Sequence, residues 1–203
     1  MPKVHFVKTA RKDNPGGNIK KGESYYWWQF RGLPKSYSKV QPKRSQLTNS
    51  PYLKWVYYQL DEFTLEGLTD DDIQSNIEQI KDELEELKDE MQDAIDRMPE
   101  QFQDTCLNYD RVPVAEDCIS TLDGIDYDEL ERISRELKEI KEKYVVVAVG
   151  GADTDGDSPK EEFDIEQMSS DDKDAYVDLL REREEAVESI YSEVSDSLSN
   201  LDM

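Results

Sequence analysis

Hydrophobic residues recur at alternating spacings of four and three between residues 69 and 98, and this is the clearest pattern in the chain. Such spacing places apolar side chains along one face of a helix. Thr69 and the three aspartates after it form a capping box, and Pro99 ends the helix. A heptad register is expected, with its apolar positions at Ile73, Ile77, Ile80, Leu84, Leu87, Met91, Ala94 and Met98.

Two further helical stretches carry similar apolar stripes. One covers residues 114–122 and, after Gly124, residues 127–144, and the other covers residues 170–201. Their stripes consist of Leu130, Ile133, Leu137 and Ile140 in the first, and of Tyr176, Leu180, Val187, Ile190, Val194 and Leu201 in the second. Residues 98–114 hold two prolines and are predicted to connect a helical hairpin. Stripes this narrow favour an antiparallel coiled-coil bundle, or association with the helices of a second copy.

The N-terminal part follows a different period. Val4 and Phe6 alternate with polar residues, and residues 24–40 are predicted to form a β-hairpin after a turn at residues 14–17. Tyr25, Trp27 and Gln29 are expected on one face of its first strand, and Tyr26, Trp28 and Phe30 on the other. One of the two tryptophans is assigned to a core. A short helix is expected from Pro51.

The fold class is therefore α+β and mostly α. A small antiparallel β module over residues 1–66 precedes a helical domain over residues 67–203, which contains an acidic loop at residues 150–168. Residues 144–149 form either a strand that pairs with the N-terminal hairpin or the apolar end of a helix. Asp153, Asp155 and Asp157 have the spacing of a calcium loop, but the following positions do not fit, and a solvated acidic linker is preferred.

Charge is segregated along the chain, which has a formal net charge of -23. Residues 1–54 contain 12 Lys or Arg against Asp13 and Glu23, and the remainder contains 13 basic and 46 acidic residues. This division predicts a basic surface for an anionic partner and an acidic body that is solvated or offered to a cationic partner. Alternatively, the two parts attract each other.

Several functional classes lack their motifs. There is no phosphate-binding loop, dinucleotide fingerprint or nucleophile elbow, and His5 is the single histidine, so we expect no enzyme, no cofactor and no metal. No apolar run is long enough for a membrane span or a signal peptide, which favours the cytoplasm. Cys106 and Cys118 are expected to be reduced and buried at helix ends.

The basic aromatic segment is the candidate site. Tryptophan and tyrosine stack on bases while lysine and arginine neutralise phosphates, so nucleic acid is the expected ligand. The expected site residues are Lys20, Lys21, Tyr25, Trp27, Arg31, Lys35, Lys39, Lys43 and Arg44. The alternative is that the aromatics only build a core. Two other functions stay open: an acidic helical inhibitor that occupies the nucleic-acid site of a host protein, and an assembly factor.

Three segments carry a resemblance, namely KKGESYYWWQFR at residues 20–31, KSYSK at residues 35–39 and PKRSQLTNSPYL at residues 42–53. They resemble a set of uncharacterised bacteriophage-type proteins, some of which have paired cysteines like those of a zinc ribbon. The resemblance implies a ribbon-like module, a helical C-terminal part and a place in the host cytoplasm. This chain has no cysteine at residues 14–18 or 41–44, so a metal-free module is expected, held by glycine geometry and aromatic packing.

Overall fold

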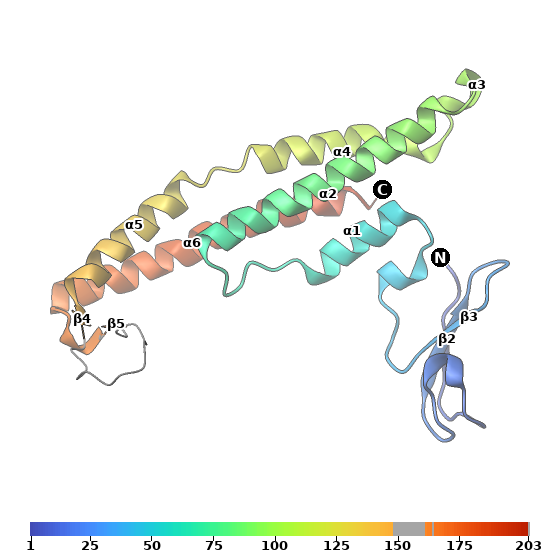
Figure 1. The fold of residues 1–203 in the computed structure, drawn as a ribbon, viewed down its shortest axis with the longest axis horizontal. Helices are drawn as coiled ribbons and strands as arrows, with labels where there is room; N and C mark the ends of the chain where they lie inside the picture. Colours follow the sequence, from blue (N-terminus) through green and yellow to red (C-terminus); the bar gives the residue numbers. More distant parts are fainter. Residues whose placement is uncertain (148–160, 164, 203) are drawn as a thin grey trace, which may run out of the picture. The chain divides into compact units, whose positions relative to one another are not determined.

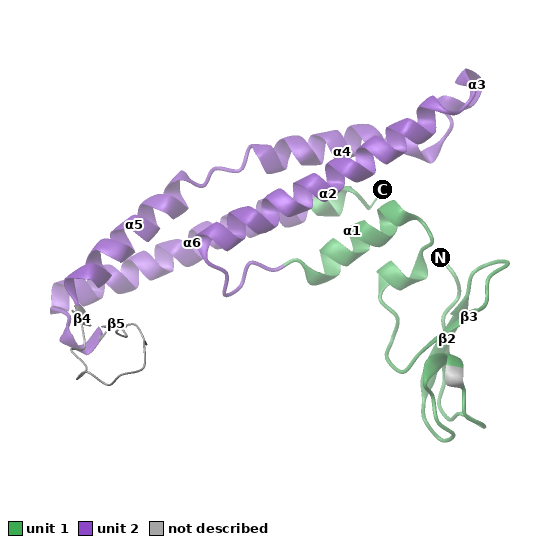
Figure 2. Cartoon of the chain, in the orientation of Figure 1, with its two compact units in different colours: residues 1–63, 198–203 green, residues 64–197 purple. Residues whose placement is uncertain are grey.

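The computed structural model describes residues 1–147, 161–163 and 165–202. They form two compact units, one made of residues 1–63 and 198–203 and the other of residues 64–197 (Figure 2). The first border lies within three residues of the predicted division after residue 66. The C-terminal residues of the first unit were not expected there. The fold is mostly helical with a small N-terminal sheet, as the sequence predicted (Figure 1).

The sheet of the first unit has three antiparallel strands in the order β1-β2-β3. Its strands are β1 (His5–Val7), β2 (Tyr25–Gln29) and β3 (Lys35–Ser38), which confirms the predicted hairpin and the alternating start of the chain. Trp27 on the central strand lies opposite His5 on one side and Tyr37 on the other. Cross-strand neighbours share a face, so these three side chains lie on one side of the sheet.

Trp28 is the tryptophan of the core. Its side chain points to the opposite face from Trp27 and only 5% of the residue is exposed. Its indole N–H is buried without an acceptor among the described residues. An orphaned donor of this kind opposes folding, so the burial of the large apolar ring must outweigh it.

A loop and a short helix complete the first unit. The 3-10 turn η1 (Pro15–Gly17) follows β1, and η2 (Arg44–Leu47) packs against the predicted helix α1 (Pro51–Glu62). The Ser50 side chain caps α1, and proline occupies its first position, where the missing N–H costs nothing. The buried Tyr52 hydroxyl donates to the Leu201 carbonyl at 3.2 Å, which ties the C-terminus to this unit.

Helix α2 (Asp70–Asp96) begins at the predicted capping box, in which the Asp72 N–H donates to the Thr69 hydroxyl at 3.2 Å. Its heptad continuation is not confirmed, because Leu87, Ala94 and Met98 are only half-buried. Five of the predicted positions are buried, namely Ile73, Ile77, Ile80, Leu84 and Met91, and they are joined by Ile95, which was not predicted. The interval from Ile73 to Met91 equals five turns of a straight helix, and so does the interval from Ile77 to Ile95. The buried residues therefore follow the period of a straight helix rather than the heptad repeat.

A helical hairpin is connected here as predicted, but the segment predicted as its connection, residues 98–114, is largely helical. It contains the short helix α3 (Glu100–Gln103) and the first turns of α4 (Leu107–Asp123), which runs back alongside α2 and packs against it (Figure 1). Pro113 lies inside α4 and removes one backbone hydrogen bond. The helix continues through it because its neighbours Val112 and Ala115 are buried.

Helices α5 (Asp128–Lys143) and α6 (Ser170–Asn200) lie close to the expected ranges. Their shared core consists of Ile133, Leu137, Ile140, Met168, Tyr176 and Leu179. Leu180 was predicted on this stripe but is 40% exposed, whereas Leu179 is 8% exposed. Tyr176, Ile190, Val194 and Leu201 are buried as predicted, so the prediction was wrong at Leu180 and not for the stripe as a whole.

Residues 145–147 form the strand β4 (Val145–Val147), but its predicted pairing with the N-terminal hairpin was wrong. β4 pairs antiparallel with β5 (Glu161–Phe163), which lies inside the predicted acidic loop together with the turn η3 (Ile165–Gln167). A partner close in sequence has less loop-closure entropy to overcome than a distant hairpin. The calcium-like spacing at Asp153, Asp155 and Asp157 lies outside the described residues. In the described chain no helix is both long and apolar enough to cross a membrane.

Candidate nucleic-acid interface

The first unit carries all of the basic residues that the sequence analysis selected. Residues 1–63 and 198–203 contain 12 Lys or Arg and five Asp or Glu. The second unit has 13 basic and 43 acidic residues. The unit with the aromatic sheet is therefore cationic while the helical unit is strongly anionic.

Three of the selected cations are paired within the first unit. Lys39 lies 3.0 Å from Glu23, Lys43 pairs with Glu62, and Arg44 lies 2.7 Å from Asp202. The Lys20 backbone N–H donates to the Glu23 carboxylate at 2.7 Å. This hydrogen bond and the Lys39 ammonium lower the pKa of Glu23. The three cations are thus partly neutralised before any phosphate approaches.

Arg44 is further held by an aromatic ring. Its guanidinium lies 4.1 Å from the centroid of the Tyr57 ring, and the hydrogen bond to Asp202 raises the pKa of the arginine. Burial raises the pKa of the Tyr57 hydroxyl. Arg44 therefore stabilises the packing of η2, α1 and the C-terminus. Because its guanidinium is already engaged, it is poorly placed to contact nucleic acid.

Trp27 is already stacked. The His5 ring lies parallel to it with centroids 4.2 Å apart, and the Lys35 ammonium lies 4.2 Å from the ring centroid. His5 comes from β1 and Lys35 from β3, which flank β2 on opposite sides. An incoming base would have to displace one of them, so Trp27 is not an open stacking platform in this structure.

Lys20, Lys21 and Arg31 are exposed and form no ion pair with the described residues. The two lysines precede β2, where the Lys21 backbone N–H donates to the Asp13 carboxylate at 2.7 Å. Arg31 follows β2 and borders a cavity of about 390 Å³ that is lined mainly by apolar residues such as Phe30 and Leu53. These three cations are the selected ones that remain available to an anion.

Tyr25 lies in a cavity that the sequence analysis did not identify. This cavity, of about 540 Å³, is lined by Thr9, Arg11, Lys12, Asp13 and Tyr37 among others. The rings of Tyr25 and Tyr37 are tilted with centroids 6.1 Å apart. Tyr37 was detectable from sequence, because it lies two residues from both Lys35 and Lys39 and so shares their face of an extended chain, whereas Arg11 and Lys12 carried no local signal.

The cavity wall is fixed by the turn at residues 14–19. Asn14 and Ile19 form a two-way backbone bridge at 2.8 and 3.1 Å, and Asn18 between them adopts a positive φ of 49°. Gly17 packs so closely that an added Cβ would lie 2.5 Å from the Tyr37 Cβ. Hydrogen bonds and glycine packing against an aromatic residue thus hold the turn.

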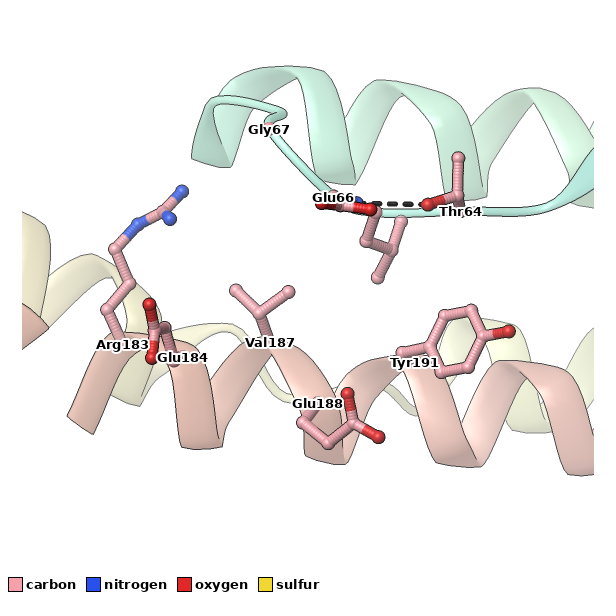
Figure 3. Close-up of a pocket in the computed structure, with 9 residues that line it drawn as sticks. Thr64, Glu66, Gly67, Arg183, Glu184, Val187, Glu188 and Tyr191 are labelled. Carbon is pink, nitrogen blue, oxygen red and sulfur yellow. Dashed lines mark hydrogen bonds between the residues drawn. The ribbon is translucent and has the colours of Figure 1, made fainter. Parts of the chain in front are cut away.

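A third cavity, of about 450 Å³, lies within the helical unit between residues 64–67 and α6. Figure 3 shows Arg183 and Val187 reaching from α6 toward that segment. Glu66, Glu184 and Glu188 line it, together with Tyr191. Arg183 is engaged with Asp70 at 2.6 Å, so the remaining lining is acidic. Its chemistry suits a cationic group.

No group of three or more His, Cys, Asp or Glu among the described residues is placed to hold a metal ion. Cys106 and Cys118 are free thiols, and Cys118 lies within α4 rather than at a helix end as predicted. Comparison of the chain with protein-family models, curated proteins and solved structures found no match.

Proposed function

We propose that this chain is a non-enzymatic nucleic-acid-binding protein whose N-terminal unit contacts the strand and whose helical unit mediates assembly. The observation that supports this most is the concentration of unpaired cations around an aromatic sheet in one compact unit, beside a cavity lined by two tyrosines. Cations neutralise phosphates and aromatic rings stack on bases, a combination typical of proteins that bind single strands. A phage origin is part of the proposal and rests on the resemblance of the first 60 residues.

The acidic unit limits this binding. Its 43 acidic residues repel phosphates, so affinity is expected to be moderate and to depend on the orientation in which the strand approaches. The helices offer apolar and acidic surfaces to other chains, and a second copy is one such partner.

The test is a fluorescence-anisotropy titration of the full chain with single-stranded and duplex DNA and RNA over a range of salt concentrations. A fragment of residues 1–66 is unsuitable, because it lacks the Leu201 and Asp202 contacts of the first unit. If five cations contact phosphates of a single strand, the slope of log K against log salt is expected to be about −3.5. Absence of salt-dependent binding to every nucleic acid would reject the proposal.

A second candidate function uses the helical unit. The acidic lining of the cavity at Glu66, Glu184 and Glu188, with Tyr191 beside it, favours the basic segment of a protein partner, as an inhibitor of a nucleic-acid-binding protein would require. Replacing Glu184 and Glu188 with lysine would abolish such binding and leave nucleic-acid binding by the first unit intact. The opposite result would reject this candidate.

A further inference from the structure

The cavity beside Tyr25 has the features of a ligand site rather than of a packing defect. Its volume of about 540 Å³ falls within the range of about 300–1,000 Å³ that small-molecule sites occupy. Its floor is the sheet face that carries Tyr25 and Tyr37, and its wall is the segment after β1. That wall is held in place by the Ala10 N–H, which donates to the Glu23 carbonyl at 2.8 Å, and by the Asn14–Ile19 bridge.

The two tyrosines offer a stacking surface that Trp27 does not. Both rings are partly exposed, and neither hydroxyl forms a hydrogen bond with the described residues. Their centroids are too close, and their planes too tilted, for a base to slide between them. A single planar ring can therefore stack on one tyrosine while the other closes its edge.

The polar groups of the cavity are divided by charge. Arg11 and Lys12 are exposed and make no ion pair with the described residues, which leaves two cations for an anionic group. One oxygen of Asp13 accepts from the Lys21 N–H at 2.7 Å, and its other oxygen is left as an acceptor. A carboxylate accepts hydrogen bonds and cannot donate, so it selects a ligand edge that carries an amino group.

We propose that this cavity binds one unpaired nucleotide of a single strand, with its base stacked on Tyr25 or Tyr37 and its phosphate beside Arg11 and Lys12. The Asp13 carboxylate accepts from the exocyclic amino group of the base, so cytosine and adenine are preferred over uracil and thymine. This inference rests on the proposed nucleic-acid binding and names its ligand. A base within a duplex is excluded, because its faces are covered by its neighbours.

The experiment begins with crosslinking in the full chain. A cytosine strand of about eight nucleotides, within the site sizes of single-strand-binding folds, carries one 5-iodocytidine and is irradiated on the protein. Mass spectrometry of the digest is expected to find the label on Tyr25 or Tyr37. Labels confined to other aromatic residues, such as Phe6 or Trp27, would overturn the inference while leaving nucleic-acid binding in place.

Affinity measurements use variants with matched controls. Tyr37→Leu keeps the Cβ that packs on Gly17 and is expected to weaken binding of the cytosine strand by roughly 5- to 100-fold, the effect of losing one stacked base. Tyr58→Leu removes an exposed tyrosine of α1 and should have no such effect. Equal affinities for the two variants would overturn the inference.

Charge and base preference are separated in the same assay. Replacing Arg11 and Lys12 with alanine should weaken binding more than replacing Lys3 and Lys54, which removes the same charge from exposed positions of the same unit. Asp13→Asn should abolish the preference for cytosine over uracil, because an amide can serve either base. An unchanged preference would overturn the role of Asp13.

Two further outcomes identify which idea fails. If no strand binds at any salt concentration, the proposed function falls and this inference falls with it. If free cytidine monophosphate competes with the strand at comparable concentration, the ligand is a free nucleotide and the single-strand assignment is overturned. If the unlabelled strand competes strongly and free cytidine monophosphate does not, the single-strand assignment is supported.

Discussion

Arg183 of α6 donates two hydrogen bonds to one carboxylate oxygen of Asp70 at the start of α2, with its Nη2 at 2.6 Å and its Nε at 3.0 Å. The guanidinium also donates to the Leu68 carbonyl at 3.0 Å, and the Ser134 hydroxyl of α5 donates to Asp70. Three helices of the second unit thus meet at one carboxylate. The side chains of Arg183 and Asp70 are only 27% and 21% exposed, so solvent screens this pair less than a surface pair.

Arg183→Ala is therefore expected to lower the free energy of unfolding by about 2 kcal/mol, because it leaves Asp70 without its charged donor. Arg97→Ala serves as the control, since Arg97 and Asp93 form a fully surface-exposed pair and its loss should cost about 0.5 kcal/mol or less. Urea unfolding followed by circular dichroism measures both. A loss at Arg183 no larger than that at Arg97 would show that the cluster does not stabilise the unit.

Neighbouring leucines of α6 test which face of the helix is buried. Leu179→Ala is expected to destabilise the protein by about 2–4 kcal/mol, because the side chain lies in the core shared with α5. Leu180→Ala should cost less than about 1 kcal/mol, since that side chain is 40% exposed. Similar losses in the two variants would contradict the observed packing of α6.

Local signals were read correctly from the sequence, and the errors came from longer-range geometry. The capping box at Thr69 and the strand alternation around Trp27 depend on a few neighbouring residues. The choice of Ala94 over Ile95 followed heptad spacing, from which a straight helix drifts by about 20° per heptad. Leu179 and Leu180 lie three and four residues after Tyr176, so spacing alone does not decide which of them is buried. Each error displaces a single buried position by one residue.

The candidate site was predicted in part for the same reason. Its basic and aromatic composition was visible, but the pairing of Arg44 with Asp202 joins residues 158 positions apart and has no local signal. The stack of Trp27 with His5 depends on strand register, and so does the approach of Tyr25 to Tyr37. Sequence composition identified the unit in which basic and aromatic residues gather, whereas tertiary contacts decide which of those residues are already paired.

The two thiols are expected to differ in reactivity. Burial raises the pKa of Cys118, which is 3% exposed, and this suppresses the reactive thiolate. Cys106 is half-buried at the start of α4, about 18 Å away along the helix at 1.5 Å per residue, too far for a disulfide within the chain. Ellman's reagent should modify Cys106 in the folded protein and Cys118 only on unfolding. In Cys106→Ser, rapid reaction of the folded protein would contradict this.

Acid should weaken the start of α6. The Tyr144 hydroxyl and then the Ser169 hydroxyl donate to the Asp172 carboxylate and lower its pKa. A lowered folded pKa contributes stability that is present above the unfolded value of about 3.9 and is lost as pH falls through the folded value. The difference in urea midpoint between the natural chain and Asp172→Asn should therefore shrink as pH falls from about 6 to about 3.

Asp171→Asn provides the control for this measurement, because it removes the adjacent charge from the same helix turn. The Asp171 carboxylate has no hydrogen bond with the described residues. Asp171→Asn therefore changes the interaction with the helix dipole in the same way as Asp172→Asn does, but it leaves the contacts of Asp172 with Tyr144 and Ser169 in place. If the two variants show the same dependence on pH, the hydrogen bonds to Asp172 do not cause the acid sensitivity.

Two triple variants test whether internal pairing decides which cations bind nucleic acid. Replacing Lys20, Lys21 and Arg31 with alanine removes unpaired charges, and replacing Lys39, Lys43 and Arg44 removes charges that Glu23, Glu62 and Asp202 already engage. Both variants lose three charges from the same unit, so their long-range fields change alike. Only the first should reduce the salt slope of single-strand binding by about 2, since each phosphate contact contributes about 0.7. Equal reductions would mean that the ion pairs open on binding, and that the paired cations are part of the interface after all.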